Sequence, residues 1–149
     1  MPGTEDLQQL VYAKAVRNES TRLRPLAGIL LRKKVNKDTE VDGYSLKAGR
    51  LAIFSIFNIH HHPDFWPQPE QFDPERFLTR ENRAFSFMPF GKGERICICS
   101  HFALVESQLL LCMIVQHCDL QLLGNDEVNV EMAVTLRPKG GIPVRIKWR

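Results

Sequence analysis

A cysteine placed behind two glycines and ahead of a long apolar run constrains this chain more than any other feature of its sequence. The glycines at positions 91 and 93 let the backbone approach the sulfur of Cys97 closely. The residues from Ser100 onward have helical spacing, and the N-terminus of a helix favours negative charge, which stabilises a thiolate. A thiolate is a strong, electron-donating ligand for haem iron. The segment 87–99 therefore predicts a loop that presents Cys97 as a metal ligand.

Other interpretations of this segment start from the same residues. Two glycines alone form a turn, and a single cysteine is more often a packed core residue than a ligand. The pair Cys97 and Cys99 is also compatible with zinc or redox chemistry, although zinc sites usually use two well-separated ligand pairs. Cys112 and Cys118 fall in the interior of the following helical run, where we expect them to be buried. Haem ligation is favoured, and zinc binding stays open.

An acidic and a basic residue three positions apart belong to the first predicted helix. Helical spacing begins at Thr4, an N-cap residue, and ends near Arg24 because Pro25 disfavours helix there. Glu19 falls on the apolar stripe, and Arg22 is within reach one turn on. A solvated surface ion pair would contribute little to stability, whereas a buried charge requires a partner and hydrogen bonds. The position of Glu19 favours the buried alternative.

The proline-rich segment 63–71 cannot form a regular helix or a central strand. Irregular coil normally lies on the surface, and an exposed linker is one interpretation. This coil, however, is accompanied by aromatic side chains that favour burial: Phe65, Trp66, Phe72 and Phe77. We expect a packed irregular loop that leads to Arg76.

Three motifs, in this order and approximate spacing, resemble those of the cytochrome P450 (haem-thiolate monooxygenase) family. The family signature Phe-x-x-Gly-x-Arg-x-Cys-x-Gly is matched at Phe90, Gly93, Arg95 and Cys97, and the chain departs from it at Cys99, where the family has glycine. Glu-x-x-Arg at 19–22 resembles the helix K motif of the family, and Pro-Glu-Arg-Phe at 74–77 resembles its meander. The resemblance covers nearly the whole chain.

The resemblance implies a haem b cofactor with the Cys97 thiolate as its axial ligand. The residues implied to bind the cofactor are Phe90, Gly91, Gly93, Arg95, Cys97 and Ala103. Glu19, Arg22 and Arg76 are implied to form a structural triad behind the haem. The implied activity is that of a monooxygenase, which inserts one oxygen atom of O2 into a small organic substrate with electrons from a ferredoxin or a flavoprotein. The alternatives are a truncated, non-catalytic haem-binding module or subunit, and a structural or zinc-binding domain.

The remaining pattern predicts an α+β fold, the C-terminal part of the mainly α cytochrome P450 fold, with residues 1–149 as one partial domain. Expected strands cover 26–34, 39–41, 44–46 and 51–57, with Asp42-Gly43 as a hairpin turn. A connector from Asn58 to His62 carries three histidines, which we interpret as surface residues with at most one of them buried. A helix over 101–118 and a terminal hairpin, with strand residues between Val134 and Trp148 around a turn at 138–141, complete the prediction.

The length and charge of the chain limit the functions that it can carry out by itself. The chain has 149 residues, roughly a third of the length of the family that it resembles, and lacks the small-Gly-x-acid-Thr motif of the oxygen-activating helix. We therefore expect the proximal half of a haem pocket, from a truncated gene product or a split subunit. The net charge is only +3, and the basic cluster at 32–34 lacks interleaved aromatic residues, so we expect no nucleic-acid partner. We interpret the cluster as a solvated strand edge, with either Arg32 or Lys33 facing a haem propionate.

Cysteine usage and hydropathy bear on the compartment. Four cysteines without a signal peptide favour a reducing environment, and no apolar run reaches the length of a membrane span. We expect a cytoplasmic protein.

Overall fold

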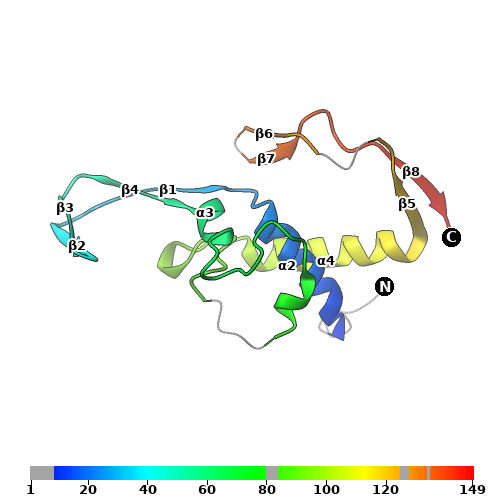
Figure 1. Cartoon of the computed structure of the whole chain (residues 1–149), viewed down its shortest axis with the longest axis horizontal. Coiled ribbons are helices and arrows are strands. Elements are labelled where there is room, and N and C mark those ends of the chain that lie inside the picture. The colour runs from blue at the N-terminus through cyan, green and yellow to red at the C-terminus, as the bar shows by residue number, and fades with distance from the viewer. Residues whose placement is uncertain (1–8, 80–83, 125–127, 134) are drawn as a thin grey trace.

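The structure, a computed structural model, describes residues 9–79, 84–124, 128–133 and 135–149. Two helices cross near its centre, α2 (Val11–Leu23) and α4 (Ser100–His117), and β-hairpins extend beyond them (Figure 1). Helix α2 ends at Leu23 because Pro25 follows, as the sequence predicts. Helix α4 covers the run expected at 101–118 except Cys118, which begins a strand, and Cys112 and Cys118 are half-buried where the sequence predicts them to be buried. Arg17 of α2 joins the two helices, since its Nη1 donates to the Leu104 carbonyl at 2.8 Å.

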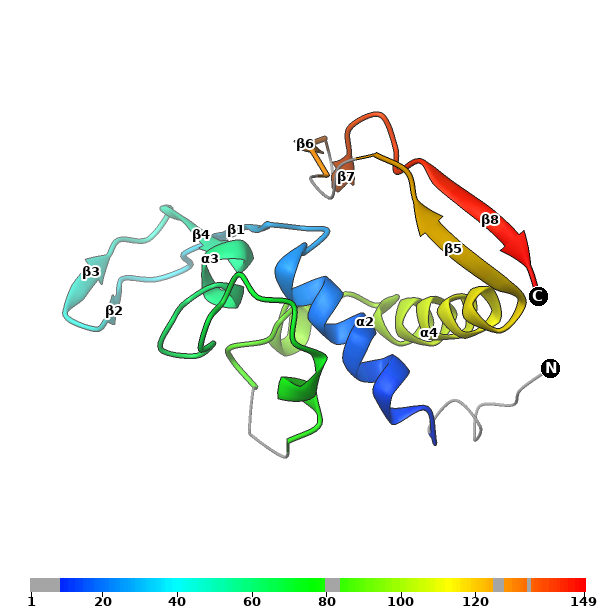
Figure 2. The same cartoon turned by 45° about the vertical axis from the view of Figure 1, so that its right-hand side comes forward.

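The strands of the described residues pair in antiparallel, two-stranded ladders. The ladders are β1 (Ile29–Lys34) with β4 (Leu51–Ser55), β2 (Thr39–Val41) with β3 (Tyr44–Leu46), β5 (Cys118–Leu122) with β8 (Val144–Trp148), and β6 (Val130–Met132) with β7 (Leu136–Pro138). The turn between β2 and β3 is Asp42-Gly43, with left-handed φ angles of 48° and 77°. This confirms the predicted hairpin, which projects away from the helices (Figure 2). The α+β class is confirmed as well.

The strand expected over 26–34 begins only at Ile29, and two further segments differ from the sequence prediction. The strand expected to reach residue 57 ends at Ser55, and Ile56–His60 form a short helix, α3. Ser55 caps this helix, because its Oγ accepts a hydrogen bond from the Asn58 N–H at 3.2 Å. The strands on either side of the turn at 138–141 do not pair with each other, since β7 pairs with β6 and β8 pairs with β5. In the terminal region β8 thus pairs with a strand distant in sequence, β5, whereas β7 pairs with the preceding strand β6.

The best-packed part of the molecule lies between α2 and the coil that follows α3. Trp66 is buried there, and so are apolar side chains of α2 and α3 (Ala15, Leu23 and Ile56). The short turn η1 (Pro74–Phe77) packs against α2, and the rings of Phe77 and Phe87 lie around Trp66, with centroids 5.6 and 6.4 Å from it. The proline-rich coil is therefore packed through Trp66, whereas Phe65 and Phe72 are exposed.

Some expectations lie outside the described residues. Thr4 and Val134 are among them, and so are the side chains of Arg32 and Lys33, so the cap at Thr4 and the propionate contact stay predictions. The continuous helix expected from Thr4 is wrong, because Leu10 is non-helical, with a ψ of 61°, and α2 begins at Val11. In the part of the chain that is described, no helix has both the length and the apolar character needed to cross a membrane.

Candidate functional site

Backbone hydrogen bonds hold the loop that precedes α4. The Gly91 N–H donates to the Met88 carbonyl at 3.0 Å, and the Cys97 N–H donates to the Phe90 carbonyl at 3.0 Å. Gly91 and Gly93 both have a φ of 81°, in the left-handed region that favours glycine. The path of this loop therefore requires glycine at both positions.

Cys97 and Cys99 lie at the end of the loop, immediately before α4. Both thiols are free and exposed. The Ser100 N–H donates to the Cys97 carbonyl at 3.1 Å, and the Ala103 N–H donates to the Cys99 carbonyl at 2.9 Å, so the helix begins around the two cysteines. Cys99 has a φ of −85°, which lies outside the left-handed region. The cysteine that replaces the family glycine therefore causes no left-handed backbone strain.

The residues expected to bind a cofactor lie in this loop and in the first turn of α4. They are Phe90, Gly91, Gly93, Arg95, Cys97 and Ala103. Gly91 is buried, Phe90 and Ala103 are half-buried, and Arg95, at the end of the short turn η2 (Gly93–Arg95), is exposed. Two apolar side chains close to Cys97 in the sequence are exposed as well: Ile98 at 96% and Phe102 at 68%.

The donor set fits a haem better than a zinc ion. Over the described residues, no group of three or more His, Cys, Asp or Glu side chains is placed to hold a metal ion. Protein zinc sites need three or four such ligands, whereas haem iron takes a single axial thiolate from the protein. A free thiol beside exposed apolar side chains suits a cofactor with a broad apolar face.

Glu19 and Arg22 of α2 form an ion pair with 0% exposure of either side chain. Arg22 Nε and Nη2 donate to Glu19 Oε2 and Oε1 at 2.7 and 2.8 Å, a bidentate geometry. Arg76 Nε donates to Glu19 Oε1 at 3.3 Å, and the Asp73 N–H donates to the same oxygen at 2.9 Å. Burial alone would raise the pKa of Glu19, but hydrogen bonds from Arg22 and the Asp73 N–H outweigh it and lower the pKa. Glu19 therefore stays a carboxylate although it is buried.

Backbone carbonyls of the coil satisfy the two arginines further. Arg22 Nη1 donates to the His60 carbonyl at 2.8 Å, and Arg76 Nη1 donates to the Pro67 carbonyl at 2.8 Å. The Arg22 guanidinium also lies over the Trp66 ring, 5.1 Å from its centroid. The cluster of Glu19, Arg22 and Arg76 thus joins α2 to the irregular coil by charge-assisted hydrogen bonds.

His60 belongs to this region, although the sequence prediction assigns it no role. It is the fully buried member of the three consecutive histidines, since His61 is half-buried and His62 is exposed. Its Nε2 accepts a hydrogen bond from the Met88 N–H at 3.0 Å. The cap at Ser55 was the available signal, because a helix that begins there places residues 56 and 60 on one face.

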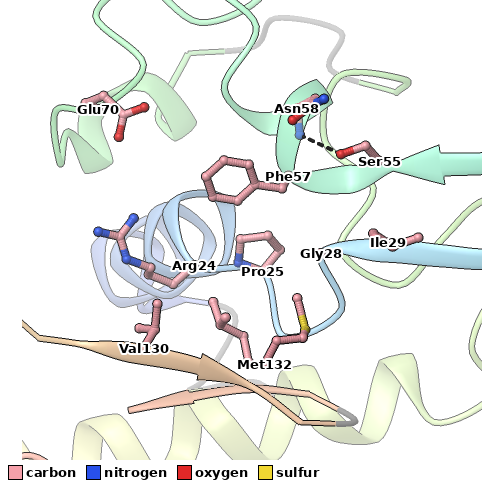
Figure 3. Close-up of a pocket in the computed structure, with 11 residues that line it drawn as sticks. Arg24, Pro25, Gly28, Ile29, Ser55, Phe57, Asn58, Glu70, Val130 and Met132 are labelled. Atoms are coloured by element: carbon pink, nitrogen blue, oxygen red, sulfur yellow. Dashed lines mark hydrogen bonds between the residues drawn. The ribbon is translucent and has the colours of Figure 1, made fainter. Parts of the chain in front are cut away.

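A pocket of about 580 Å³ lies where the end of α2 meets β1, α3 and the β6–β7 hairpin. Figure 3 shows apolar side chains of Pro25, Phe57 and Met132 in its walls, with Arg24 and Glu70 toward one side. Its lining includes no residue of the loop from Phe90 to Cys99. The pocket is therefore separate from the site around the thiol.

Comparisons with known proteins identify the family. The cytochrome P450 family model matches residues 1–144. "Putative cytochrome P450 132" of Mycobacterium tuberculosis is 37% identical over 145 residues, which are 96% of this chain and 31% of that protein. Human cytochrome P450 4V2 is 34% identical, over 99% of this chain and 29% of that protein. The solved structure "Retinoic acid bound cyanobacterial CYP120A1" has a TM-score of 0.92 and 30% identity, and the match covers 100% of this chain and 35% of that chain.

The chain belongs to the cytochrome P450 family. The predicted family is confirmed, and so is the assignment of the fold to a part of the P450 fold. The chain spans about a third of the length of the relatives that it matches. Membership in this family implies a haem cofactor with a cysteine thiolate ligand.

Proposed function

We propose that this chain is the haem-thiolate binding portion of a cytochrome P450 monooxygenase, with Cys97 as the axial ligand of haem b. One observation carries the proposal: the free, exposed Cys97 thiol stands just before α4, behind two left-handed glycines. When bound, a thiolate-ligated haem supplies an electron-rich iron that favours O–O cleavage.

The chain's own residues would hold and orient this cofactor. Gly91 and Gly93 shape the loop so that backbone N–H groups can approach the sulfur, and Cys97 lies just before the N-terminus of α4. Phe90 and Ala103 offer apolar surface, and Arg95 offers a positive charge for a cofactor carboxylate. Glu19, Arg22 and Arg76 would act at a distance, as the triad that fixes α2 against the coil.

The implied partners are a small organic substrate and an electron donor, a ferredoxin or a flavoprotein. Lys92 and Arg95 are exposed close to Cys97 and outnumber the nearby acidic residue Glu94. A locally positive surface of this kind favours association with an acidic electron carrier. We propose that the carrier docks on this face.

Haem supplied during expression of the full chain tests the proposal. We expect the parent to bind haem and to show, when reduced and exposed to carbon monoxide, the red-shifted Soret band of a thiolate-ligated haem. Cys97→Ala should lose this band, while Cys112→Ala, which removes a half-buried thiol within α4, should keep it. A parent chain that binds no haem, or a Cys97→Ala variant with an unchanged band, contradicts the proposal.

A further inference from the structure

His60 lies between the buried ion pair and the cysteine loop. Its backbone bonds to the ion pair and its ring to the loop. The carbonyl accepts from Arg22 Nη1 at 2.8 Å, and ring Nε2 accepts from the Met88 N–H at 3.0 Å. The ring also stacks on Phe87, with centroids 5.2 Å apart. The side chain has no exposed surface, so these contacts are made without competition from water.

The hydrogen bond to Met88 requires a neutral imidazole. Nε2 can accept a hydrogen bond only when the proton is on Nδ1. Burial lowers the pKa of His60 to about 4, against the raising effect of the nearby Arg22 and Thr21 carbonyls. The acceptor on Nε2 is therefore present at neutral pH.

Met88 connects His60 to the turn that contains Gly91. Its N–H is held by His60, and its carbonyl accepts from the Gly91 N–H at 3.0 Å. Phe90, two residues after Met88 in the same turn, accepts from the Cys97 N–H at 3.0 Å through its carbonyl. A continuous path of hydrogen bonds and short chain segments thus leads from Arg22 through His60 to Cys97.

We propose that His60 is a positioning residue for the thiolate loop: its neutral ring fixes the Met88 end of the loop to the buried Glu19–Arg22 pair. The effect on haem ligation rests on the proposed function, whereas the effect on the loop does not. The ring acts through Met88 and Gly91, and it does not itself touch Cys97.

Two substitutions separate the hydrogen bond from the bulk of the ring. His60→Phe keeps an aromatic ring against Phe87 but removes the acceptor, and His60→Gln restores an acceptor through its amide oxygen. The first measurement is amide hydrogen exchange at Met88 in the full chain, with the Arg24 amide as an internal control. The Arg24 N–H donates to the Ser20 carbonyl at 2.9 Å at the end of α2, and His60 Nε2 takes no part in this hydrogen bond. The second measurement is the fraction of haem that shows the thiolate-type carbonyl band.

For His60→Phe we expect exchange at Met88 to be about three- to tenfold faster, with Arg24 unchanged, because one buried hydrogen bond is lost. The thiolate fraction should fall in parallel, and His60→Gln should return both quantities toward the parent. Unchanged exchange at Met88, an unprotected Met88 amide in the parent, or equal acceleration at Met88 and Arg24 would each overturn the inference. A parent that binds no haem would contradict the proposed function alone, and the contrast between Met88 and Arg24 would still decide whether His60 holds the loop.

Discussion

The junction of α2 with the coil and the loop that carries Cys97 are built in opposite ways. At the junction, the side chains of Glu19 and Arg22 and the whole of His60 and Trp66 are buried, and both charges are satisfied by hydrogen bonds from within the chain. The loop has ordered backbone hydrogen bonds, but its side chains from residue 92 to residue 99 are exposed.

The buried junction therefore supports the site structurally, whereas the exposed loop carries the residues that would bind the cofactor. A buried ion pair is stable only when every donor and acceptor is matched, and the chain supplies those matches itself. The loop instead presents apolar surface and a thiol, a combination that marks a binding surface more than a folded core. We expect the junction to respond to substitution in the absence of any cofactor, and the loop to respond mainly when haem is bound.

The largest effect should come from breaking the buried ion pair. Glu19→Ala leaves the Arg22 guanidinium buried without a counter-charge, so the free energy of unfolding should fall by about 3–5 kcal/mol. Arg76→Ala should cost less, because Arg22 still pairs with Glu19. Urea unfolding followed by Trp66 fluorescence measures the effect, in a Trp148→Phe background that leaves Trp66 as the only tryptophan.

The matched control is Arg24→Ala, which removes an exposed arginine one residue beyond the same helix. It should change the free energy of unfolding by no more than about 0.5 kcal/mol. Equal effects of Glu19→Ala and Arg24→Ala would mean that the ion pair contributes no more than an exposed charge.

The next largest effect is a pH dependence of stability that arises from His60 at the junction. The pKa of His60 is lowered from an ordinary value of 6.5 to about 4, so between these values the unfolded chain binds a proton that the folded chain does not. Stability should therefore be fully present above pH 6.5 and fall as the pH drops toward 4, by about 3 kcal/mol in all. His60→Gln should remove this part of the slope.

Glu19 adds a second loss of stability at lower pH. Its pKa is lowered from 4.5, so its stabilisation disappears as the carboxylate becomes protonated. That loss occurs in the parent and in His60→Gln alike, so the difference between their pH profiles isolates His60. Superimposable profiles from pH 7 to pH 4 would show that His60 is not buried in its neutral form.

The smallest effect should come from the loop. Ile98→Ala shortens a side chain that is 96% exposed, so the free energy of unfolding of the haem-free chain should change by about 0.5 kcal/mol or less. Trp66 fluorescence again provides the measurement. A loss comparable to that of Glu19→Ala would show that Ile98 is packed in solution and that the two regions are not separable.

Local chemistry in the sequence predicted the elements whose ends are set by neighbouring residues. Pro25 ends α2, Asp42-Gly43 forms the β2–β3 turn, and the apolar run after Cys99 forms α4. The three motifs also identified the family, and the structure brings Glu19, Arg22 and Arg76 together over more than fifty residues of sequence.

Of the parts that were not predicted, one depends on a contact distant in sequence and the other on a local helix cap. The turn at 138–141 favoured a local hairpin, but β8 pairs with β5, which precedes it by more than twenty residues. The sequence predicts strand and connector where helix α3 lies, because Ile53, Phe54 and Ile56 belong to one apolar run. The cap at Ser55 interrupts that run, and missing the cap also concealed the inward position of His60.

The most direct test of the account asks which of two neighbouring cysteines ligates the haem. Cys97 has the spacing of the family signature from Phe90 and Arg95, and Cys99 stands where the family has glycine but has no left-handed φ. The measurement is the Soret band of the reduced, carbonyl-bound haem in the parent, in Cys97→Ala and in Cys99→Gly. We predict that Cys97→Ala loses the thiolate-type band and that Cys99→Gly keeps it. Retention of the band in Cys97→Ala with its loss in Cys99→Gly would contradict the account and assign the ligand to Cys99.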